Sequence, residues 1–566
     1  MGEKQGGDRN YAYVPVISFF SLFLYLILFL ARSFDDNRTA SWQYVFTVAN
    51  PSILFSLLVM CLPAGWLLSR ISLEERSPSL LLFGASFAIS ALFWSEPEVI
   101  VDASRYFAEA KYLEVYGVGF FLREWGRAIP VWTDLPVVPF FYGLIFKVFG
   151  ESRFYIQIFT SCLFSLSVVL TCQVGKKLWD ADTGFYAGLL LLGIPYLYTQ
   201  IPLMLVDVPS MFFLLLAIFS FLSALEKGNA LRILLSSFAI TLAFYSKYSL
   251  WLMLSVLIII ALTYRHSLPG LKTSVYLTRA LAIALASAFL VGAVFIYHYD
   301  PLSEQIRLLL SYQRPGLQRW GESFLSTFFF QIHPLITLAA AYSLYEVWRR
   351  KDIKYLGVLW LVALVFFFQI RRIRYIIMVF PMLTLMASYG LQRIRQKEII
   401  RFITLSVVAM SIAVGVFAYL PFLRQNSAAN LANAGKYLDS LGITGAEVFT
   451  ISSKKSFVNP AVAVPVLDLF TKKQLIYNYV EKKPYSAGEL SHSPFRFSWE
   501  YKNPRYYTVT ERIGEDGSAI VLIFDGKTDE VPEGLKQRLA GLSKKVSFDK
   551  TDNVYEYQTF ITIYYR

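Results

Sequence analysis

The polar segment after the third long apolar stretch of the chain carries the residues best suited to chemistry. Asp102, Arg105 and Tyr106 lie within five residues of one another, and Asp134 follows in the same segment. A carboxylate such as Asp102 can act as a general base, and a neighbouring arginine can hold a phosphate. The alternative is a solvated ion pair between residues i and i+3, which contributes little to stability.

Two further ionisable residues interrupt apolar stretches. Asp207 lies between two strongly apolar runs, two residues before Pro209. A carboxylate there either caps the helix that Pro209 starts or serves a function. Lys247 divides another apolar run, so it either extends toward the membrane surface or marks the site of an anionic ligand.

A basic cluster precedes a late apolar stretch and consists of Arg371, Arg372, Arg374 and Tyr375. Several guanidinium groups beside a tyrosine suit recognition of a phosphate or a pyrophosphate. General contact with lipid head groups is the alternative.

The composition shows what kind of scaffold must position these residues. The chain has 566 residues, of which 56% are apolar and 16% are charged, whereas soluble proteins average about 45–50% apolar and about 25% charged residues. An ordinary soluble enzyme and a disordered chain are therefore excluded. The net charge of +13 falls mostly in short gaps between apolar runs. That pattern favours membrane topology and lipid head groups, not nucleic acid, as its explanation.

About thirteen apolar stretches are long enough to cross a bilayer. They lie at residues 14–32, 48–70, 78–95, 154–175, 184–202, 208–225, 231–246, 249–264, 276–298, 328–348, 355–370, 376–391 and 400–421. The first has no small-residue cleavage site and is followed by Arg32, so we expect a retained anchor. The sequence thus predicts an α-helical polytopic membrane protein.

The distribution of lysine and arginine predicts the orientation of these spans. With the N-terminus in the cytoplasm, the inner loops carry most of the Lys and Arg residues, as in Lys176–Lys177 and Arg349–Lys351. This alternation requires residues 96–153 to form one long outer loop. Its apolar piece 136–149 is short for a span and predicts an interfacial or re-entrant helix. The C-terminus then lies outside.

From about residue 424 the composition becomes that of a soluble domain. Helical spacing is found over 428–441 and 533–542, and strand patterns over 448–451, 519–524 and 554–565. The sequence therefore predicts two domains: a membrane domain at 1–423 with an outer loop at 96–153, and a small extracytoplasmic α/β domain at 424–566.

In this order, the motifs resemble the membrane glycosyltransferases of the GT-C fold, the branch with aminoarabinose lipid A transferases and protein O-mannosyltransferases. The matching text begins with Asp102-x-x-Arg105-Tyr106 and continues with Asp134-Leu135-Pro136. It ends with Asp207-Val208-Pro209, Lys247 and Arg374-Tyr375. The resemblance implies a GT-C fold and transfer of a sugar from a polyprenyl- or dolichyl-phosphate donor to a lipid, glycan or protein acceptor at the outer face.

The resemblance also implies roles for the residues. Asp102 becomes the base that deprotonates the acceptor, and Asp207 helps to position the acceptor or Arg105. The lipid phosphate is held by Arg105, Tyr106, Lys247, Arg371, Arg372, Arg374 and Tyr375. His333 is a weaker candidate, because a histidine at the entry of a helix needs no chemical role. Asp134 and Asp207 are the reserve candidates for the base.

Two departures from the family pattern bear on these roles. Relatives often carry Glu-Lys-Pro-Pro where this chain has Asp134-Leu135-Pro136-Val137, so a lysine is missing and phosphate binding depends more on Arg105 and Lys247. The chain also has three spans before the catalytic loop, where many relatives have one.

Other functions are less well supported by the sequence. Asp180-Ala181-Asp182 resembles a metal-binding acidic motif, but the predicted topology places it in a cytoplasmic turn. The four histidines are scattered, so no ligand pattern supports a metal ion. A transporter or flippase of lipid-linked sugars would predict ionisable residues near the bilayer midplane and an internal repeat. A non-catalytic membrane scaffold is the other alternative. The cysteine-free C-terminal domain favours the plasma membrane of a prokaryote.

Overall fold

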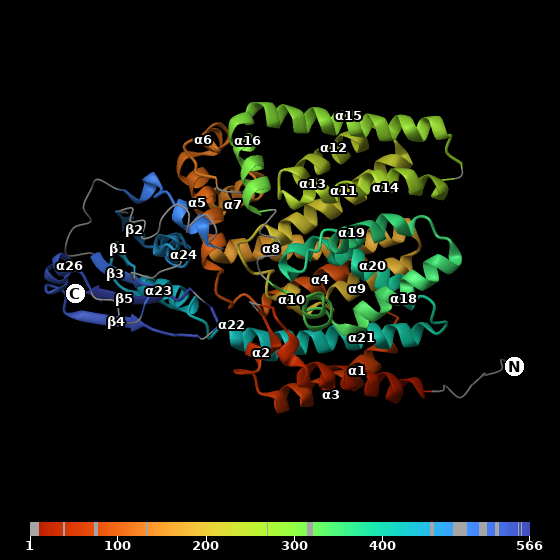
Figure 1. Cartoon of the computed structure of the whole chain (residues 1–566), viewed down its shortest axis with the longest axis horizontal. Helices are drawn as coiled ribbons and strands as arrows, with labels where there is room; N and C mark the ends of the chain where they lie inside the picture. The colour runs from red at the N-terminus through yellow and green to blue at the C-terminus, as the bar shows by residue number, and fades with distance from the viewer. Residues whose placement is uncertain are drawn as a thin grey trace.

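The structure is a computed structural model. It describes residues 11–37, 40–72, 77–131, 134–268, 270–313, 321–452, 458–478, 495–508, 518–526, 531–552, 554–555 and 557–566. A bundle of roughly parallel and antiparallel helices carries a sheet domain at one end (Figure 1). The first helix, α1 (Tyr13–Leu30), starts at the opposite end of the bundle from the sheet domain.

Among the described residues, eight helical segments are long and apolar enough to cross a membrane, and each coincides with a predicted span. They are α1, α3 (Pro51–Ser69), α8 (Arg153–Leu178), α11 (Asp207–Lys227), the segment Ser249–Ser267, α15 (Thr273–Tyr297), the segment Ile373–Leu391 and the segment Lys397–Leu423. The prediction of a multi-pass helical membrane protein is thereby confirmed.

The other five predicted spans are shorter or interrupted. Three coincide with short apolar helices: α4 (Pro78–Ala91), α12 (Ala230–Phe244) and α19 (Tyr355–Phe367). The stretch 184–202 divides into α9 (Ala181–Leu191) and α10 (Pro195–Tyr198), because Pro195 has no amide hydrogen to continue the helix. The stretch 328–348 contains α18 (Pro334–Arg350), which follows a π-helical turn at Ser326–Phe330.

The predicted outer loop is mostly helical. It contains α5 (Ile100–Tyr116), α6 (Val118–Glu124) and α7 (Val137–Phe149). Helix α7 is the short apolar helix that the sequence predicts at 136–149. It packs closely on α5. Gly143 lies so near α5 that an added Cβ atom would be only 2.7 Å from the Leu113 Cβ. This contact fixes α5, whose first turn carries Asp102.

The C-terminal domain is built on a mixed five-stranded sheet with strand order β2-β1-β3-β5-β4. The strands are β1 (Gly445–Ile451), β2 (Gln474–Tyr477), β3 (Ser518–Phe524), β4 (Lys544–Phe548) and β5 (Phe560–Tyr565). Strand β1 pairs in parallel with β2 and β3, and β5 pairs antiparallel with β3 and β4. The helices are α23 (Ala429–Ser440), α24 (Ala463–Leu469) and α26 (Glu533–Leu539). The short strands β2 and β4 and the helix α24 were not predicted.

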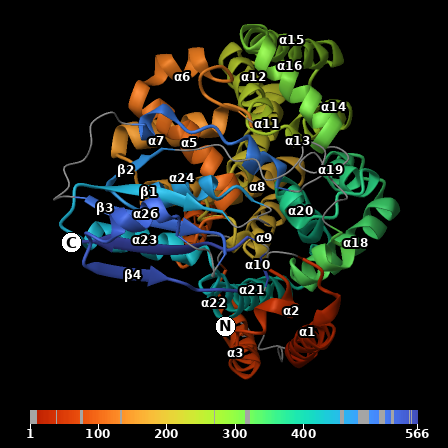
Figure 2. The same cartoon turned by 60° about the vertical axis from the view of Figure 1, so that its left-hand side comes forward.

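Helix α5 joins the sheet domain to the bundle (Figure 2). Ile100 and Ala103 on α5 are part of the apolar core of the sheet domain. Farther along α5, the Lys111 Nζ lies 2.5 Å from a carboxylate oxygen of Asp468 on α24 and 3.0 Å from one of Glu151. The domain therefore positions the helix that carries Asp102.

Candidate functional site

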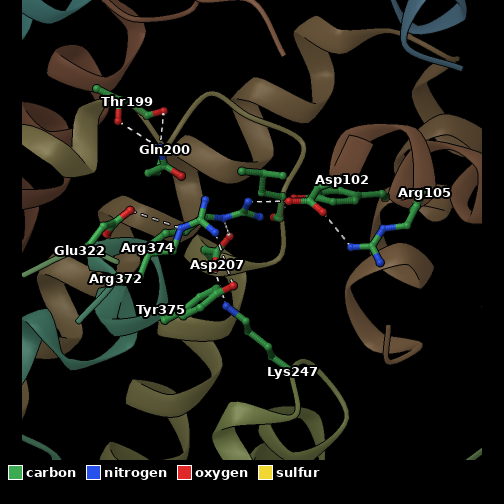
Figure 3. A network of polar contacts seen from close by, with 12 residues as sticks. Asp102, Arg105, Thr199, Gln200, Asp207, Lys247, Glu322, Arg372, Arg374 and Tyr375 are labelled. Atoms are coloured by element: carbon green, nitrogen blue, oxygen red, sulfur yellow. Dashed lines mark hydrogen bonds and ion pairs between the residues drawn. The ribbon is translucent and has the colours of Figure 1, made fainter. Parts of the chain in front are cut away.

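Four elements bring the predicted site residues to the end of the bundle that carries the sheet domain. Asp102 lies in the first turn of α5, where the helix dipole favours a carboxylate. Asp207 begins α11, and Arg374 lies in the 3-10 turn Ile373–Val379 that precedes α20 (Phe380–Leu391). Lys247 lies in the connection between α12 and α13 (Ser249–Met253). These residues are far apart in the sequence and meet in one network (Figure 3).

Arg374 is the centre of this network. Its Nη1 contacts one oxygen of Asp102 at 2.5 Å, and its Nε donates to Asp207 at 3.0 Å. The other oxygen of Asp102 accepts a hydrogen bond from Arg105 at 2.9 Å. The other oxygen of Asp207 accepts one from Lys247 at 2.5 Å. Asp207 thus contacts Arg374 and Lys247, and its predicted role in positioning the acceptor or Arg105 stays a prediction.

Burial separates the two aspartates. The side chain of Asp102 is 23% exposed and lines a cavity, whereas that of Asp207 is 1% exposed. Asp102 can therefore be reached by a ligand in the cavity, while Asp207 lies behind the two cations that it holds.

A second carboxylate contacts Arg105 from the other side. The Asp134 carboxylate lies 3.5 Å from the Arg105 Nη1 and is 4% exposed. Glu109, one turn farther along α5, is also buried, and it accepts a hydrogen bond from the Trp125 indole at 3.2 Å. The sequence analysis did not identify Glu109, because a glutamate in an amphipathic helix is usually solvated.

The charges around Asp102 determine its protonation. Burial by itself would raise the pKa of Asp102, but the positive charges of Arg374 and Arg105 outweigh burial and hold the pKa below its usual range. Burial raises the pKa of Asp134, against the attraction of Arg105 and with a contribution from the charge of Asp102. Asp102 is therefore ionised in the free protein.

The cavity has a volume of about 830 Å³. Eight of the eleven predicted site residues line it, namely Asp102, Arg105, Tyr106, Asp134, Lys247, Arg372, Arg374 and Tyr375. One of its walls is apolar and comes from α13, α19 and the segment after α16 (Tyr299–Leu308). That wall consists of Leu252, Met253, Leu309, Leu310, Leu361, Leu364, Val365 and Phe368. The cavity thus joins a cluster of cations to an apolar surface.

Arg371 and His333 are not among the residues that line this cavity. The Arg371 side chain is exposed and donates to Gln369, while its carbonyl accepts a hydrogen bond from Thr327. His333 caps α18, because its Nδ1 accepts the amide hydrogen of Leu335, and its ring contacts Tyr25 edge-on. His333 therefore lies at the start of a helix and caps it, as expected for a histidine without a chemical role.

Arg372 has a partner that the sequence analysis missed. Its Nε lies 3.7 Å from a carboxylate oxygen of Glu322, and the other oxygen of Glu322 accepts the amide hydrogen of Ile373. Glu322 is buried, with 3% of its surface exposed. Glu322 holds the arginine turn in place, and nothing in the local sequence pattern distinguishes it from a solvated loop residue.

The acidic motif at residues 180–182 lies at the far end of the bundle. Asp180 caps α9 by accepting the amide hydrogen of Thr183, and Asp182 pairs with Lys397 at 2.5 Å. Within the described ranges, no three His, Cys, Asp or Glu side chains are placed to hold a metal ion.

The chain resembles a known protein family over part of its length and a solved structure over most of its length. Residues 133–291 match the family described as dolichyl-phosphate-mannose-protein mannosyltransferase. No curated protein sequence matches the chain significantly. Among solved structures, ArnT from Cupriavidus metallidurans in the apo state is similar, with a TM-score of 0.51 and 12% identity over 86% of this chain and 97% of ArnT. ArnT bound to undecaprenyl phosphate gives a TM-score of 0.50 at 11% identity over the same shares.

The likeness to ArnT at this low identity concerns the fold, and the family match concerns the segment that contains Asp134, Asp207 and Lys247. Together with the eight apolar helices, these findings agree with the motifs that the sequence shares with this class. The chain is a multi-pass membrane protein that shares the fold of ArnT, and its residues 133–291 match a glycosyltransferase family.

Proposed function

We propose that the protein transfers a sugar from a polyprenyl- or dolichyl-phosphate donor to a lipid, glycan or protein acceptor. The observation that carries this proposal is the cavity that joins the cations Arg105, Lys247 and Arg374 to an apolar wall. A lipid-linked phosphate has the matching chemistry, with a charged head and a hydrocarbon chain.

The relatives support a lipid-phosphate donor. The matched family is described by dolichyl-phosphate-mannose as its donor, and ArnT is described bound to undecaprenyl phosphate. We propose the same donor class for this chain. This donor class concerns the lipid phosphate alone and does not include the identity of the sugar or of the acceptor.

In the proposed reaction, Asp102 is the base. The acceptor oxygen forms a bond to the anomeric carbon of the sugar as its proton moves to Asp102. The bond between that carbon and the phosphate oxygen breaks, and its electron pair stays on the phosphate. Arg374 and Lys247 stabilise the charge that grows there. The resemblance to GT-C enzymes implies a single displacement with inversion.

The binding of the donor would also change the basicity of Asp102. In the free protein Arg374 and Arg105 stabilise its charged form. A phosphate that shares Arg374 adds a negative charge nearby, which raises the pKa of Asp102 toward that of an effective base. We infer that the donor activates the base.

We propose that Asp207 is a positioning residue. It is fully buried and contacts both Arg374 and Lys247, so it fixes the two cations at the cavity surface. We also propose that the site and the sheet domain face the outside of a prokaryotic plasma membrane and that the N-terminus is cytoplasmic.

The test uses purified protein in lipid with a panel of polyprenyl-phosphate sugars, and it follows release of the lipid phosphate. Asp102→Asn keeps the shape and removes the base, so we expect turnover to fall by about 100- to 10,000-fold. Asp182→Asn, at the far end of the bundle, is the matched control and should keep full turnover. Equal turnover in wild type and Asp102→Asn would exclude Asp102 as the base and transfer the role to Asp134.

A further inference from the structure

The cavity has polar lining residues besides the predicted site residues. They include Glu96 before α5, Gln200 after α10, and Asn426 between the last span and α23. These residues come from the membrane domain on one side and from the start of the C-terminal domain on the other.

The three side chains share an unusual property. Each is at least nine-tenths buried, with 3% exposure for Glu96 and 6% for both Gln200 and Asn426. One side-chain oxygen of each, Glu96 Oε2, Gln200 Oε1 and Asn426 Oδ1, has no hydrogen-bond partner within the part of the chain that the structure describes. Buried polar atoms are nearly always paired, since an unpaired one costs about 1–3 kcal/mol. Three such oxygens on residues that line one cavity indicate a ligand that supplies the missing hydrogen bonds.

The nature of these groups limits what the ligand can be. Amide oxygens accept hydrogen bonds, so the ligand must donate them. Burial raises the pKa of Glu96 well above its usual range, although Arg153 lowers it. Burial therefore favours the neutral form of Glu96. Neutral donors such as hydroxyl groups fit these three side chains best.

Aromatic side chains accompany these residues. Tyr196 on α10 and Tyr555 from the C-terminal domain line the same cavity. The Tyr555 side chain shares a hydrogen bond with the Asn426 side chain. Aromatic faces beside polar groups that fix orientation suit a ligand with both apolar and hydroxyl surfaces.

We propose that Glu96, Gln200 and Asn426 form a subsite for the hydroxyl groups of a sugar, with Tyr196 and Tyr555 beside it. This inference rests on the proposed function and deepens it. The cations hold the phosphate, and the hydroxyl subsite holds a sugar residue in the same cavity. That sugar belongs either to the lipid-linked donor or to a glycan acceptor.

The test compares binding of three kinds of probe to full-length protein in lipid: bare undecaprenyl phosphate, a panel of undecaprenyl-phosphate hexoses and pentoses, and neutral oligosaccharides. The variants are Gln200→Met and Asn426→Leu, which remove the unpaired oxygens and keep the size. Gln392→Met is the matched control, because Gln392 also has an unpaired amide atom but is not a cavity residue.

We expect wild type to bind at least one sugar probe more tightly than the bare lipid. Each subsite variant should weaken that binding by about fivefold, as expected for the loss of one hydrogen bond. Binding of bare undecaprenyl phosphate should change less than twofold, and Gln392→Met should change neither. A loss confined to the lipid-linked sugars assigns the subsite to the donor. A loss confined to the oligosaccharides assigns it to the acceptor.

Two results would overturn the hydroxyl subsite. One is that no sugar probe binds wild type more tightly than its sugar-free counterpart. The other is that the variants leave sugar binding unchanged or weaken the bare lipid equally. Failure of the proposed function has a different signature: bare undecaprenyl phosphate would bind equally well to wild type and to Arg374→Met.

Discussion

Asp102 and Asp207 both contact Arg374, yet their surroundings give them different chemistry. Asp102 faces the cavity and shares its charge with Arg374 and Arg105, whereas Asp207 is enclosed behind Arg374 and Lys247. A general base must reach the proton that it removes. Exposure to the cavity, which cannot be seen in the sequence, is what favours Asp102 for that role.

The proposed activation of Asp102 by the donor predicts a difference between two pH profiles. A base must be deprotonated, so activity falls as the pH drops through its pKa. In the free protein the pKa of Asp102 is lowered by Arg374 and Arg105, although burial alone would raise it. The acid limb of kcat/KM, which reports the free enzyme, should therefore lie at lower pH than that of kcat. Coincident acid limbs would contradict activation by the donor.

The enclosed position of Asp207 predicts a loss of stability in Asp207→Asn. The substitution removes the buried negative charge that pairs with Arg374 and Lys247 at the cavity surface, and breaking a buried ion pair costs about 3–5 kcal/mol. We expect a lower Tm in detergent, and undecaprenyl phosphate should recover part of the loss by supplying the missing charge. Asp182→Asn, whose partner Lys397 is 56% exposed, should keep the wild-type Tm. An unchanged Tm in Asp207→Asn would show that the ion pairs of Asp207 with Arg374 and Lys247 do not stabilise the fold.

At the scale of elements, the placement of α5 decides the geometry of the site. Its first turn carries Asp102 and Arg105, one face packs on α7, and Ile100 and Ala103 pack into the core of the C-terminal domain. Lys111 adds ion pairs to Asp468 and Glu151. Because both parts of the molecule hold α5, a shift of either part would move Asp102, the proposed base.

The contact of α5 with α7 can be tested at Gly143. A Cβ there would lie 2.7 Å from the Leu113 Cβ and 2.8 Å from the Ala110 carbonyl oxygen. Gly143→Ala must therefore separate the helices, and we expect about 1–3 kcal/mol of destabilisation together with reduced turnover.

Gly119→Ala on α6 is the control, because a Cβ at Gly119 meets nothing within 4 Å. That change should be neutral or stabilise the helix slightly. Thermal unfolding and turnover of the two alanine variants, measured side by side, would decide. Equal Tm and equal turnover of the two variants would mean that the close packing of α5 on α7 affects neither stability nor activity.

On the scale of the whole molecule, the site and the sheet domain share one end of the bundle, and the start of α1 lies at the other (Figure 1). The helix ends on the far side carry Lys177 on α8, Arg350 on α18 and Lys397 at the start of α21 (Lys397–Val414). This separation fits the predicted orientation, in which positive loops face the cytoplasm.

The orientation predicts which surface positions an external reagent can reach. In a background that lacks the three native cysteines, Gly541→Cys in the sheet domain and Gly270→Cys before α15 both introduce an exposed thiol with open space around it. A membrane-impermeant maleimide added to intact cells should label Gly541→Cys and not Gly270→Cys. Permeabilised cells should label both. The reverse pattern would place the sheet domain in the cytoplasm.

Much of the architecture could be read from hydropathy and local pattern. The long apolar runs at α1, α8, α11 and α15 are spans because a bilayer requires about twenty apolar residues in a helix with its own hydrogen bonds satisfied. The strands β1, β3 and β5 are strongly apolar and were predicted, whereas β4 (Lys544–Phe548) is half-exposed and carries no such signal. Periodicity is a local property, so the sequence determines these elements by itself.

The partners of the charged residues were decided only by the tertiary structure. The sequence determined that Asp102, Asp207, Lys247 and Arg374 are ionisable residues at the edges of apolar runs. Only the packing of α5, α11 and α20 brings them within hydrogen-bond distance and leaves Asp102, but not Asp207, at the cavity. Glu322 and the unpaired oxygens of Gln200 and Asn426 have no sequence signature. The physical reason is that burial and ion pairing depend on contacts between distant segments, which no local pattern specifies.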